Sequence, residues 1–379
     1  MSDTHGSSHH TSHDHACCGH DHGNDHSGAL ASPLEGHAEF GAAETPVLVE
    51  VTRGGIVESR HRGIAAIVDA EGHVVAHWGD FEKPVYARSS VKSLQAIPLV
   101  ESGAVEAFGI SDEELALACA SHNGETRHTT LVSAWLERIG LTPADLECGT
   151  HLPYDDATAH ALIRAGEAPS PVHNNCSGKH TGMLATALRK GEPTRGYIRF
   201  DHPVQQRILG VFEQMTACDL SKAPWGVDGC GIPTIAIPLG SVALAMARLA
   251  DPRELPDHRA EAVTHIRRAW AANPYLIGGR DTFDTRMMEA TGGDALIKIG
   301  AEGVMCAVLP KLGLGIALKI EDGASRAAGI AMAALLRQCK VLTDARWNEL
   351  AGVTHPDITN RAGLAVGGIR PAEGWPEQV

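Results

Sequence analysis

Aromatic side chains are scarce in this chain: Phe, Trp and Tyr make up 4% of its 379 residues. Because 43% of the residues are nevertheless hydrophobic, the composition predicts a core built mainly from Ala, Leu, Val and Ile. A hydrophobic fraction of this size, with 21% charged residues, excludes a collagen, a disordered chain and a small disulfide-stabilised protein. The chain is long enough for two average domains or one large one.

Positive charge is scarce as well. The chain has 32 Lys and Arg against 46 Asp and Glu, a formal net charge of −14. Non-specific nucleic-acid binding and docking on an anionic membrane both depend on clustered Lys and Arg. We therefore expect neither nucleic acid nor a membrane as a partner.

The first 46 residues contain no Lys or Arg and almost no apolar side chains. They hold nine His, two Cys, six Gly and seven acidic residues, a composition that cannot bury enough surface to offset the entropy of ordering. We predict a disordered His-rich tail over residues 1–46. Its clustered His and Cys could bind zinc, nickel or copper weakly, so a metal-binding protein that acts through this tail is one hypothesis.

The beginning of the chain also lacks the basic start and apolar stretch of a secretory signal. The nine Cys are odd in number and scattered, unlike a disulfide framework. Both features favour a cytoplasmic protein with reduced thiols. The longest uncharged run, residues 229–247, is nineteen residues rich in Gly and Pro, which disfavour a membrane helix. We interpret it as a loop, a short strand and a helix in a soluble core.

Short segments typical of antiparallel strands occur at both ends of the remaining chain. They are VLVEV, GIAAIVDA and HVVAHW at the start, and ALIKIG, GVMCAVL and LGIALKIE near residues 295–321. Helical patterns lie between them, near 127–139, 155–165, 180–190, 203–217, 241–250, 257–271 and 282–290, and a capping box begins a further helix at Ser111. A helix over 325–342 closes the body.

These patterns predict an α/β fold in a single catalytic domain over residues 47–379. Its mainly antiparallel sheet would combine strands from both ends of the chain, with a helical subdomain inserted over about 105–290. A site built from early, middle and late residues would then lie between the sheet and the insert.

Ser89 and Lys92 form the only Ser-x-x-Lys or Thr-x-x-Lys pattern in a chain with nine Lys. On a helix, residues three apart share one face. A buried, neutral lysine can take the proton of a serine hydroxyl and make it nucleophilic. The alternative is that Ser89 caps a helix, kinked at Pro98, and that Lys92 points into water.

Two further clusters of polar residues carry possible chemistry. Ser121 to Glu125 follow an apolar helix, either as a C-terminal cap with left-handed Gly124 or as a hydroxyl and a carboxylate facing a pocket. Cys176, Lys179 and Cys230 supply two thiols and an amine that could bind zinc. Alternatively, Cys176 is a nucleophile with Lys179 as its base, or both cysteines are buried and inert.

Taken together, six segments resemble the bacterial L-asparaginase family of the Rhizobium etli inducible type (class 3). They are RSSVK, ASHNGE, NNCSGKHTGML, VDGCGIPT, GGRDTFDT and ALIKIGAEGV, in the same order within residues 47–342. The resemblance implies a fold similar to serine β-lactamases and penicillin-binding proteins. It also implies hydrolysis of L-asparagine to L-aspartate and ammonia by a homodimer.

The resemblance further implies two Ser-Lys pairs, Ser89 with Lys92 and Ser121 with Lys298. The zinc site that the resemblance implies falls on Cys176, Lys179 and Cys230. We expect zinc to orient the substrate or the loop at Cys176. The expected substrate-binding residues, chosen for charge or for their place in the motifs, are Arg88, His122, Glu125, Asn175 and Asp228. A glutaminase or another serine acyl-hydrolase of the β-lactamase-like fold is the alternative enzyme.

Overall fold

The computed structural model describes residues 45–377. The predicted disordered tail lies outside the described residues, apart from Thr45 and Pro46. Within residues 45–377, no helix has both the length and the apolar character needed to cross a lipid bilayer. The uncharged run after Asp228 forms a loop, strand β6 (Pro233–Pro238) and helix α9 (Leu239–Ala250), as predicted.

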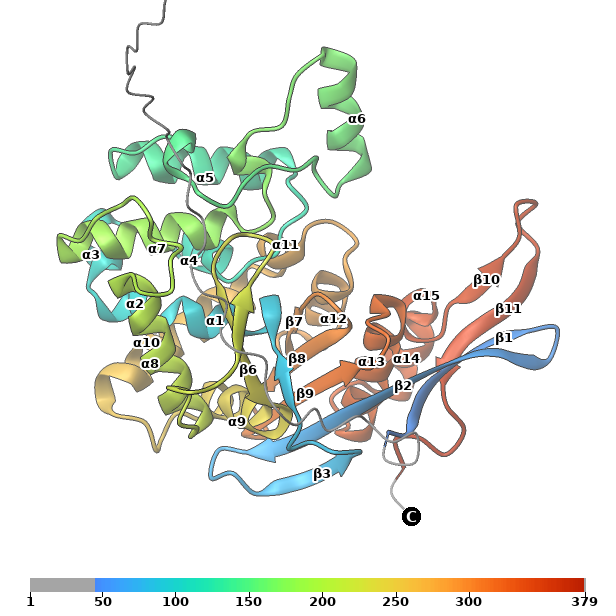
Figure 1. Ribbon diagram of the computed structural model, residues 1–379. Helices are drawn as coiled ribbons and strands as arrows, with labels where there is room; N and C mark the ends of the chain where they lie inside the picture. The colour runs from blue at the N-terminus through green and yellow to red at the C-terminus, as the bar shows by residue number, and fades with distance from the viewer. Residues whose placement is uncertain (1–44, 378–379) are drawn as a thin grey trace, which may run out of the picture. The chain divides into compact units, whose positions relative to one another are not determined.

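A large antiparallel sheet combines strands from both ends of the described chain (Figure 1). Its order is β10-β11-β1-β2-β9-β8-β7, and β3 pairs with β2 outside this order. The strands are β1 (Val47–Arg53), β2 (Ile56–Asp69), β3 (Val74–Trp78), β7 (Leu296–Ile299), β8 (Val304–Leu309), β9 (Leu314–Ile320), β10 (Asp357–Thr359) and β11 (Ala365–Pro371). The predicted α/β class, with a sheet assembled from both ends, is confirmed.

The prediction that a helix closes the body is wrong. Helix α13 (Ser325–Gln338) is followed by α14 (Asp344–Glu349), α15 (Ala351–Thr354), β10 and β11. Strand β11 contains Gly367 and Gly368, a pair more typical of a turn than of a strand. A Cβ at Gly367 would overlap the carbonyl oxygen of Thr52 on β1, so glycine is what allows these two strands to pair.

Between β3 and β7 the chain is mainly helical, as predicted for the insert (Figure 1). The helix predicted after Ser89 is broken at Ala96, because Pro98 starts a new helix and cannot donate to the preceding turn. The helices are η1 (Arg88–Val91), α1 (Lys92–Gln95), α2 (Ile97–Glu101), α3 (Ala104–Phe108), α4 (Asp112–Ala118), α5 (Thr126–Arg138), η2 (Pro143–Asp145), α6 (Asp156–Ala165), η3 (Pro171–His173), α7 (Ser177–Lys190), α8 (Pro203–Thr216), α10 (Asp257–Ala272), α11 (Pro274–Gly278) and α12 (Phe283–Thr291). A small sheet in the order β4-β6-β5, with β4 (Pro84–Tyr86) and β5 (Trp225–Val227), lies within the same part of the chain.

Helices cover the large sheet closely because the side chains between them are small. Every side chain of β8 is buried, and because successive side chains point to opposite faces, both faces of the sheet are covered there. Helix α9 packs on β9, β2 and β8, and the alanine-rich helix α13 packs on β8 and β9. The aliphatic core expected from the composition is confirmed.

Gly315 on β9 marks the closest approach of sheet and helix, since a Cβ there would overlap the backbone of α9 at Ala243 and Ala247. We expect Gly315→Ala to lower the free energy of unfolding by ~3 kcal/mol, measured by urea denaturation, because the helix must move away. Gly210→Ala on α8 is the matched control. A Cβ at Gly210 meets nothing within 4 Å, so this change should be neutral or stabilise by up to ~1 kcal/mol. Equal effects of the two changes would contradict the proposed packing.

Candidate active site

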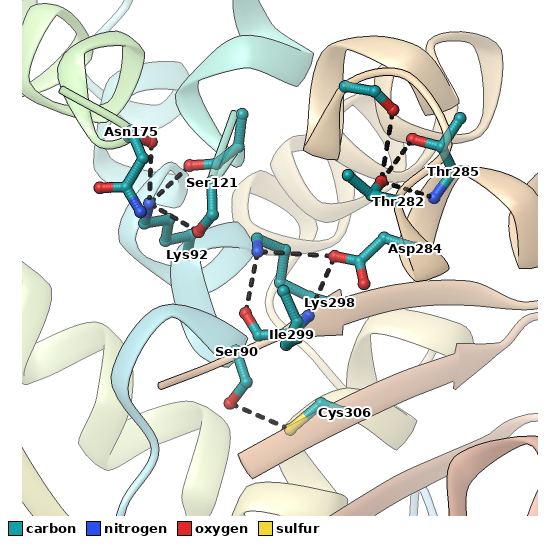
Figure 2. Close-up of polar contacts among 12 residues, drawn as sticks. Ser90, Lys92, Ser121, Asn175, Thr282, Asp284, Thr285, Lys298, Ile299 and Cys306 are labelled. Atoms are coloured by element: carbon teal, nitrogen blue, oxygen red, sulfur yellow. Dashed lines mark hydrogen bonds and ion pairs between the residues drawn. The ribbon is translucent and has the colours of Figure 1, made fainter. Parts of the chain in front are cut away.

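A strained turn positions Ser89. Arg88 has φ +51°, in the left-handed region that residues with a side chain rarely adopt. Ser90 anchors the turn to the large sheet, because its hydroxyl accepts a hydrogen bond from the Cys306 thiol of β8 at 3.3 Å (Figure 2). Backbone strain persists only where the surroundings enforce it, and it concentrates at functional sites.

Lys92 lies three residues further on, and its side chain is fully buried. Its ammonium nitrogen donates to the carbonyl oxygen of Ala120 at 2.6 Å, to Ser121 Oγ at 2.9 Å and to the carbonyl oxygen of Asn175 at 3.4 Å (Figure 2). Burial lowers the pKa of Lys92, and among these three partners none is a carboxylate. Lys92 is therefore suited to the neutral form that a general base requires.

The pairing of the serines with the lysines differs from the expected one. Within residues 45–377, the hydroxyl bonded to Lys92 is that of Ser121, and no hydrogen bond joins Lys92 to Ser89. Two backbone carbonyls and Ser121 converge on the buried amine, and a buried donor takes the acceptors that surround it. No hydrogen bond joins Ser121 to Lys298 in this range either.

Ser121 follows a helix whose start matches its sequence. In α4, the predicted capping box is present: Glu114 N–H donates to Ser111 Oγ at 3.2 Å, and Ser111 N–H donates to Glu114 Oε2 at 2.9 Å. Beyond the helix, Ser121 N–H donates to the carbonyl oxygen of Ile277 at 2.9 Å. Gly124 has φ +76°, so its left-handed conformation was correctly predicted. The Ser121 loop is thus held at both ends.

His122 is buried beneath this loop rather than facing a cavity. Its Nδ1 accepts from the Gly124 N–H at 3.1 Å, so the proton is on Nε2, which donates to Ser177 Oγ at 2.8 Å. Burial, and next the neighbouring His128, hold the pKa of His122 well below its usual value. Both ring nitrogens are occupied by protein groups. His122 therefore fixes the loop, and its direct contact with a substrate stays a prediction.

Glu125 organises the neighbouring glycine-rich loop. Its carboxylate accepts from Tyr275 OH at 3.0 Å and from the Arg280 N–H at 2.7 Å. Gly279 has φ +115°, and a Cβ there would lie 2.6 Å from Glu125 Oε1. The buried Glu125 carboxylate is thus used to shape residues 278–282, which form part of the cavity wall described next.

A cavity of about 330 Å³ collects residues from early, middle and late parts of the chain. This is the size range of small-molecule sites. Ser89, Ser121 and Asn175, three of the predicted residues, are in its wall. The other lining residues are Asn123, Tyr154, Gly278, Thr282, Phe283, Asp284, Ile299, Gly300, Ala301 and Ser325.

Ser89 also borders a second, much smaller cavity of about 10 Å³ on its other side. Arg88, Lys179 and Asp228 line this cavity. Arg88 binds Asp228 through two hydrogen bonds, from Nε at 3.0 Å and from Nη2 at 3.1 Å. Burial alone would raise the pKa of Asp228, but these bonds and the nearby Lys179 lower it. The two predicted substrate-binding charges are therefore paired with each other beside Ser89.

Lys298 on β7 is fully buried beside a carboxylate that the sequence analysis did not assign. Its ammonium nitrogen donates to the Ile299 carbonyl oxygen at 2.9 Å and lies 3.7 Å from Asp284 Oδ2 (Figure 2). Burial lowers the pKa of Lys298 to about 8, against the opposing effect of Asp284. Asp284 belongs to the GGRDTFDT segment, which contains two Asp, but nothing local says which one faces Lys298.

Cys176, Lys179 and Cys230 lie together, each at most 4% exposed. Lys179 donates to Cys230 Sγ at 3.1 Å. A hydrogen bond from Cys176, aided by the Lys179 charge, lowers the pKa of Cys230 to about 5, while the same bond and burial raise the pKa of Cys176 to about 12. Of the two thiols, Cys230 is thus the one whose surroundings favour the thiolate. Sulfur and nitrogen donors of this kind fit zinc, provided that Cys176 and Lys179 lose their protons on binding.

Ser89 and Ser121 line one cavity, Lys92 is hydrogen-bonded to Ser121, and Lys298 faces Asp284 in the cavity wall. Residues 49–371 match the L-asparaginase II family, and the chain belongs to this family. That places the protein among the amidohydrolases.

Solved structures similar to this chain include a β-lactamase from Mycobacterium bovis, at 14% identity and a TM-score of 0.37, covering 73% of this chain and 94% of that one. A mutant simvastatin synthase from Aspergillus terreus is 12% identical with a TM-score of 0.35, covering 68% of this chain and 86% of that one. Among curated proteins, none matches the chain significantly.

Proposed function

We propose that this protein hydrolyses the side-chain amide of L-asparagine to L-aspartate and ammonia, using Ser89 as nucleophile. One observation supports the proposal best. Lys92 is buried and hydrogen-bonded to Ser121, and Ser121 and Ser89 line the same cavity. Family membership supports an amide as the substrate. Within that family, the six motifs support the Rhizobium etli inducible type.

In the first half-reaction, Ser89 Oγ attacks the amide carbon. Its proton passes to Ser121 Oγ. Neutral Lys92 has two hydrogens for the Ala120 and Asn175 carbonyl oxygens, so its lone pair faces Ser121 Oγ at 2.9 Å and takes the proton of Ser121. The tetrahedral intermediate carries an oxyanion. Ser89 lies in the first turn of η1, so its own backbone N–H has no acceptor within the helix and can stabilise this charge. The Ser90 N–H already donates to the Ala87 carbonyl oxygen.

In the second half, the C–N bond breaks and the nitrogen takes the proton back from Lys92, so that ammonia leaves. The product is a β-aspartyl ester of Ser89. Water then attacks this ester and transfers its proton through the same groups, which releases L-aspartate and restores the Ser89 hydroxyl.

Substrate recognition uses the charges beside Ser89. The guanidinium of Arg88 has N–H groups beyond the two that bind Asp228, and these suit the α-carboxylate. Asp228 suits the α-amino group. The Asn175 side chain is a further polar contact in the cavity wall, whereas His122 and Glu125 act through the loops that they fix.

Cys176, Lys179 and Cys230 would hold zinc next to this recognition region. When bound, zinc would supply a fixed positive charge that orients the substrate and the Cys176 loop. Proton transfer and nucleophilic attack are left to the serines and Lys92. A homodimer in the cytoplasm completes the proposal.

The roles of the two serines can be tested with alanine variants. We expect Ser89→Ala to lower kcat for asparagine at least ~10³-fold, because the nucleophile is lost. Ser121→Ala should also lower kcat strongly, because the path to Lys92 is interrupted. Ser325→Ala is the matched control: Ser325 lines the same cavity, and within residues 45–377 no hydrogen bond joins it to a lysine, so ammonia release should stay near wild type.

Acid quenching during turnover, followed by peptide mass spectrometry, distinguishes the nucleophile from the relay. The peptide that contains Ser89 should carry an aspartyl group. An aspartyl group on the Ser121 peptide would assign the attack to Ser121 instead.

Substrate length gives a second prediction. Arg88 and Ser89 are adjacent, so the distance between the α-carboxylate and the reacting carbon is fixed by the backbone. One additional methylene misplaces the amide, which costs ~1–3 kcal/mol in a fitted site. We therefore expect kcat/KM to be about 10–100-fold higher for asparagine than for glutamine in coupled ammonia assays. Equal values would favour the glutaminase alternative.

Metal removal gives a third prediction. Dialysis against a chelator should raise KM for asparagine by about tenfold and leave kcat nearly unchanged, because only substrate binding is weakened. Added zinc should restore KM. Cys148→Ser removes a buried thiol outside the predicted ligands and should respond to the chelator like wild type. Loss of kcat at constant KM would contradict the orienting role.

A further inference from the structure

Asp284 is a carboxylate with almost no access to water. The residue is 1% exposed and follows Thr282, whose hydroxyl caps α12. Its Oδ2 accepts from the Ile299 N–H at 3.0 Å and faces Lys298 Nζ at 3.7 Å, whereas Oδ1 has no hydrogen-bond partner (Figure 2). Asp284 also contributes to the wall of the cavity that holds Ser89 and Ser121.

The pair that Asp284 forms with Lys298 is unusual within residues 45–377. Among the salt bridges of the described residues, this is the one in which both side chains are less than 2% exposed. Burying a charge is costly unless a partner compensates it, and removing one member of such a pair leaves the other uncompensated. A protein that needed only packing at this point would be served better by two apolar side chains.

Lys298 has no other anionic partner among the groups that face it. These groups are Lys92, Cys119, Cys176 and Cys306. Burial raises the pKa of Cys119 and Cys306 to about 12, and Cys176 is raised to about 12 by its bond to Cys230 and by burial. Cys119 and Cys306 are therefore neutral thiols near pH 7, and Cys176 is assigned to the proposed zinc site rather than to Lys298. Asp284 is therefore the acidic partner that favours the ammonium form of Lys298, while burial raises the pKa of Asp284 itself.

We propose that Asp284 is a positioning residue that holds Lys298 as an ammonium ion, a fixed positive charge 3.7 Å from a residue in the wall of the cavity that Ser89 and Ser121 line. This inference rests on the proposed amide hydrolysis. Lys298 then has a role different from that of Lys92. The positive charge of Lys298 stabilises the developing oxyanion through space, and in a buried site such an interaction is strong.

The loss of this charge has a defined pH dependence. With Asp284 present, the pKa of Lys298 is about 8, lowered by burial and partly restored by the carboxylate. Without the carboxylate, burial is the largest remaining effect on Lys298, and burial favours the uncharged amine. Lys298 would then lose its proton at a pH closer to 7 than it does in wild type.

The test is kcat for asparagine from about pH 5 to pH 10 in four proteins: wild type, Asp284→Asn, Asp284→Glu and Asp294→Asn. We expect kcat of Asp284→Asn to fall at lower pH than kcat of wild type, with a loss of at least about tenfold at pH 8 and little change in KM. Asp284→Glu should keep the wild-type alkaline limb. Asp294→Asn removes an exposed pair with Lys311 and should leave the profile unchanged.

An Asp284→Asn profile that is merely scaled down, with the same alkaline limb, would overturn the proposal, because it would indicate a structural role only. If Asp284→Asn does not fold, Lys298→Arg in the wild-type background decides. Arginine does not titrate in this range, so the alkaline limb near pH 8 should disappear. Its persistence would exclude Lys298 as the titrating group.

A readout independent of turnover separates this inference from the proposed function. Lys298 has a pKa of about 8 in the folded protein and an ordinary value of 10.5. The unfolded chain therefore binds more protons between these values, and the contribution of Lys298 to stability rises with pH across this window. In Asp284→Asn, Lys298 has a lower pKa, so its contribution should begin to raise Tm at a lower pH than in wild type. If asparagine is not hydrolysed but this shift is found, the proposed function fails while the Asp284–Lys298 linkage stands. Identical Tm–pH profiles would overturn the linkage.

Discussion

The amine of Lys92 has no access to water, so each of its hydrogens needs an acceptor inside the protein. Its three hydrogen-bond partners belong to residues 120, 121 and 175, which come from two loops far apart in the sequence. Satisfying one buried amine thus requires both loops to be fixed. The capping box of α4, the ring of His122 and the hydrogen bond from Ser121 N–H to Ile277 all serve this requirement.

The two buried lysines differ in the chemistry of their partners. Lys92 is surrounded by neutral oxygen acceptors, which stabilise the charged amine less than a carboxylate does. Lys298 faces the carboxylate of Asp284. Two amines of the same residue type can therefore exist in opposite protonation states at one pH, one as a base and one as a cation. This difference is created by residues outside the Ser-Lys motif.

Features that depend on residues close together in the sequence were predicted, whereas features that depend on residues far apart in the sequence were missed. The capping box at Ser111, the helices and the strands at both ends depend on patterns within a few residues, and these predictions were confirmed. Strand β11 was missed because Gly367 is required by contact with Thr52, 315 positions earlier. The partner of Lys92 was also missed, because it depends on how the loops at Ala120 and Asn175 meet in space. No spacing along the chain encodes such a meeting.

The turn at Arg88 connects the two sides of the site. Arg88 holds Asp228, and Asp228 precedes the glycine-rich turn that carries Cys230, a proposed zinc ligand. On its other side, Arg88 adjoins Ser89 in a strained backbone conformation. A change in the Cys230 turn would therefore reach the nucleophile through one ion pair and one peptide unit. The left-handed conformation of Arg88 thus lies between an ion pair on one side and Ser89, which lines both cavities, on the other.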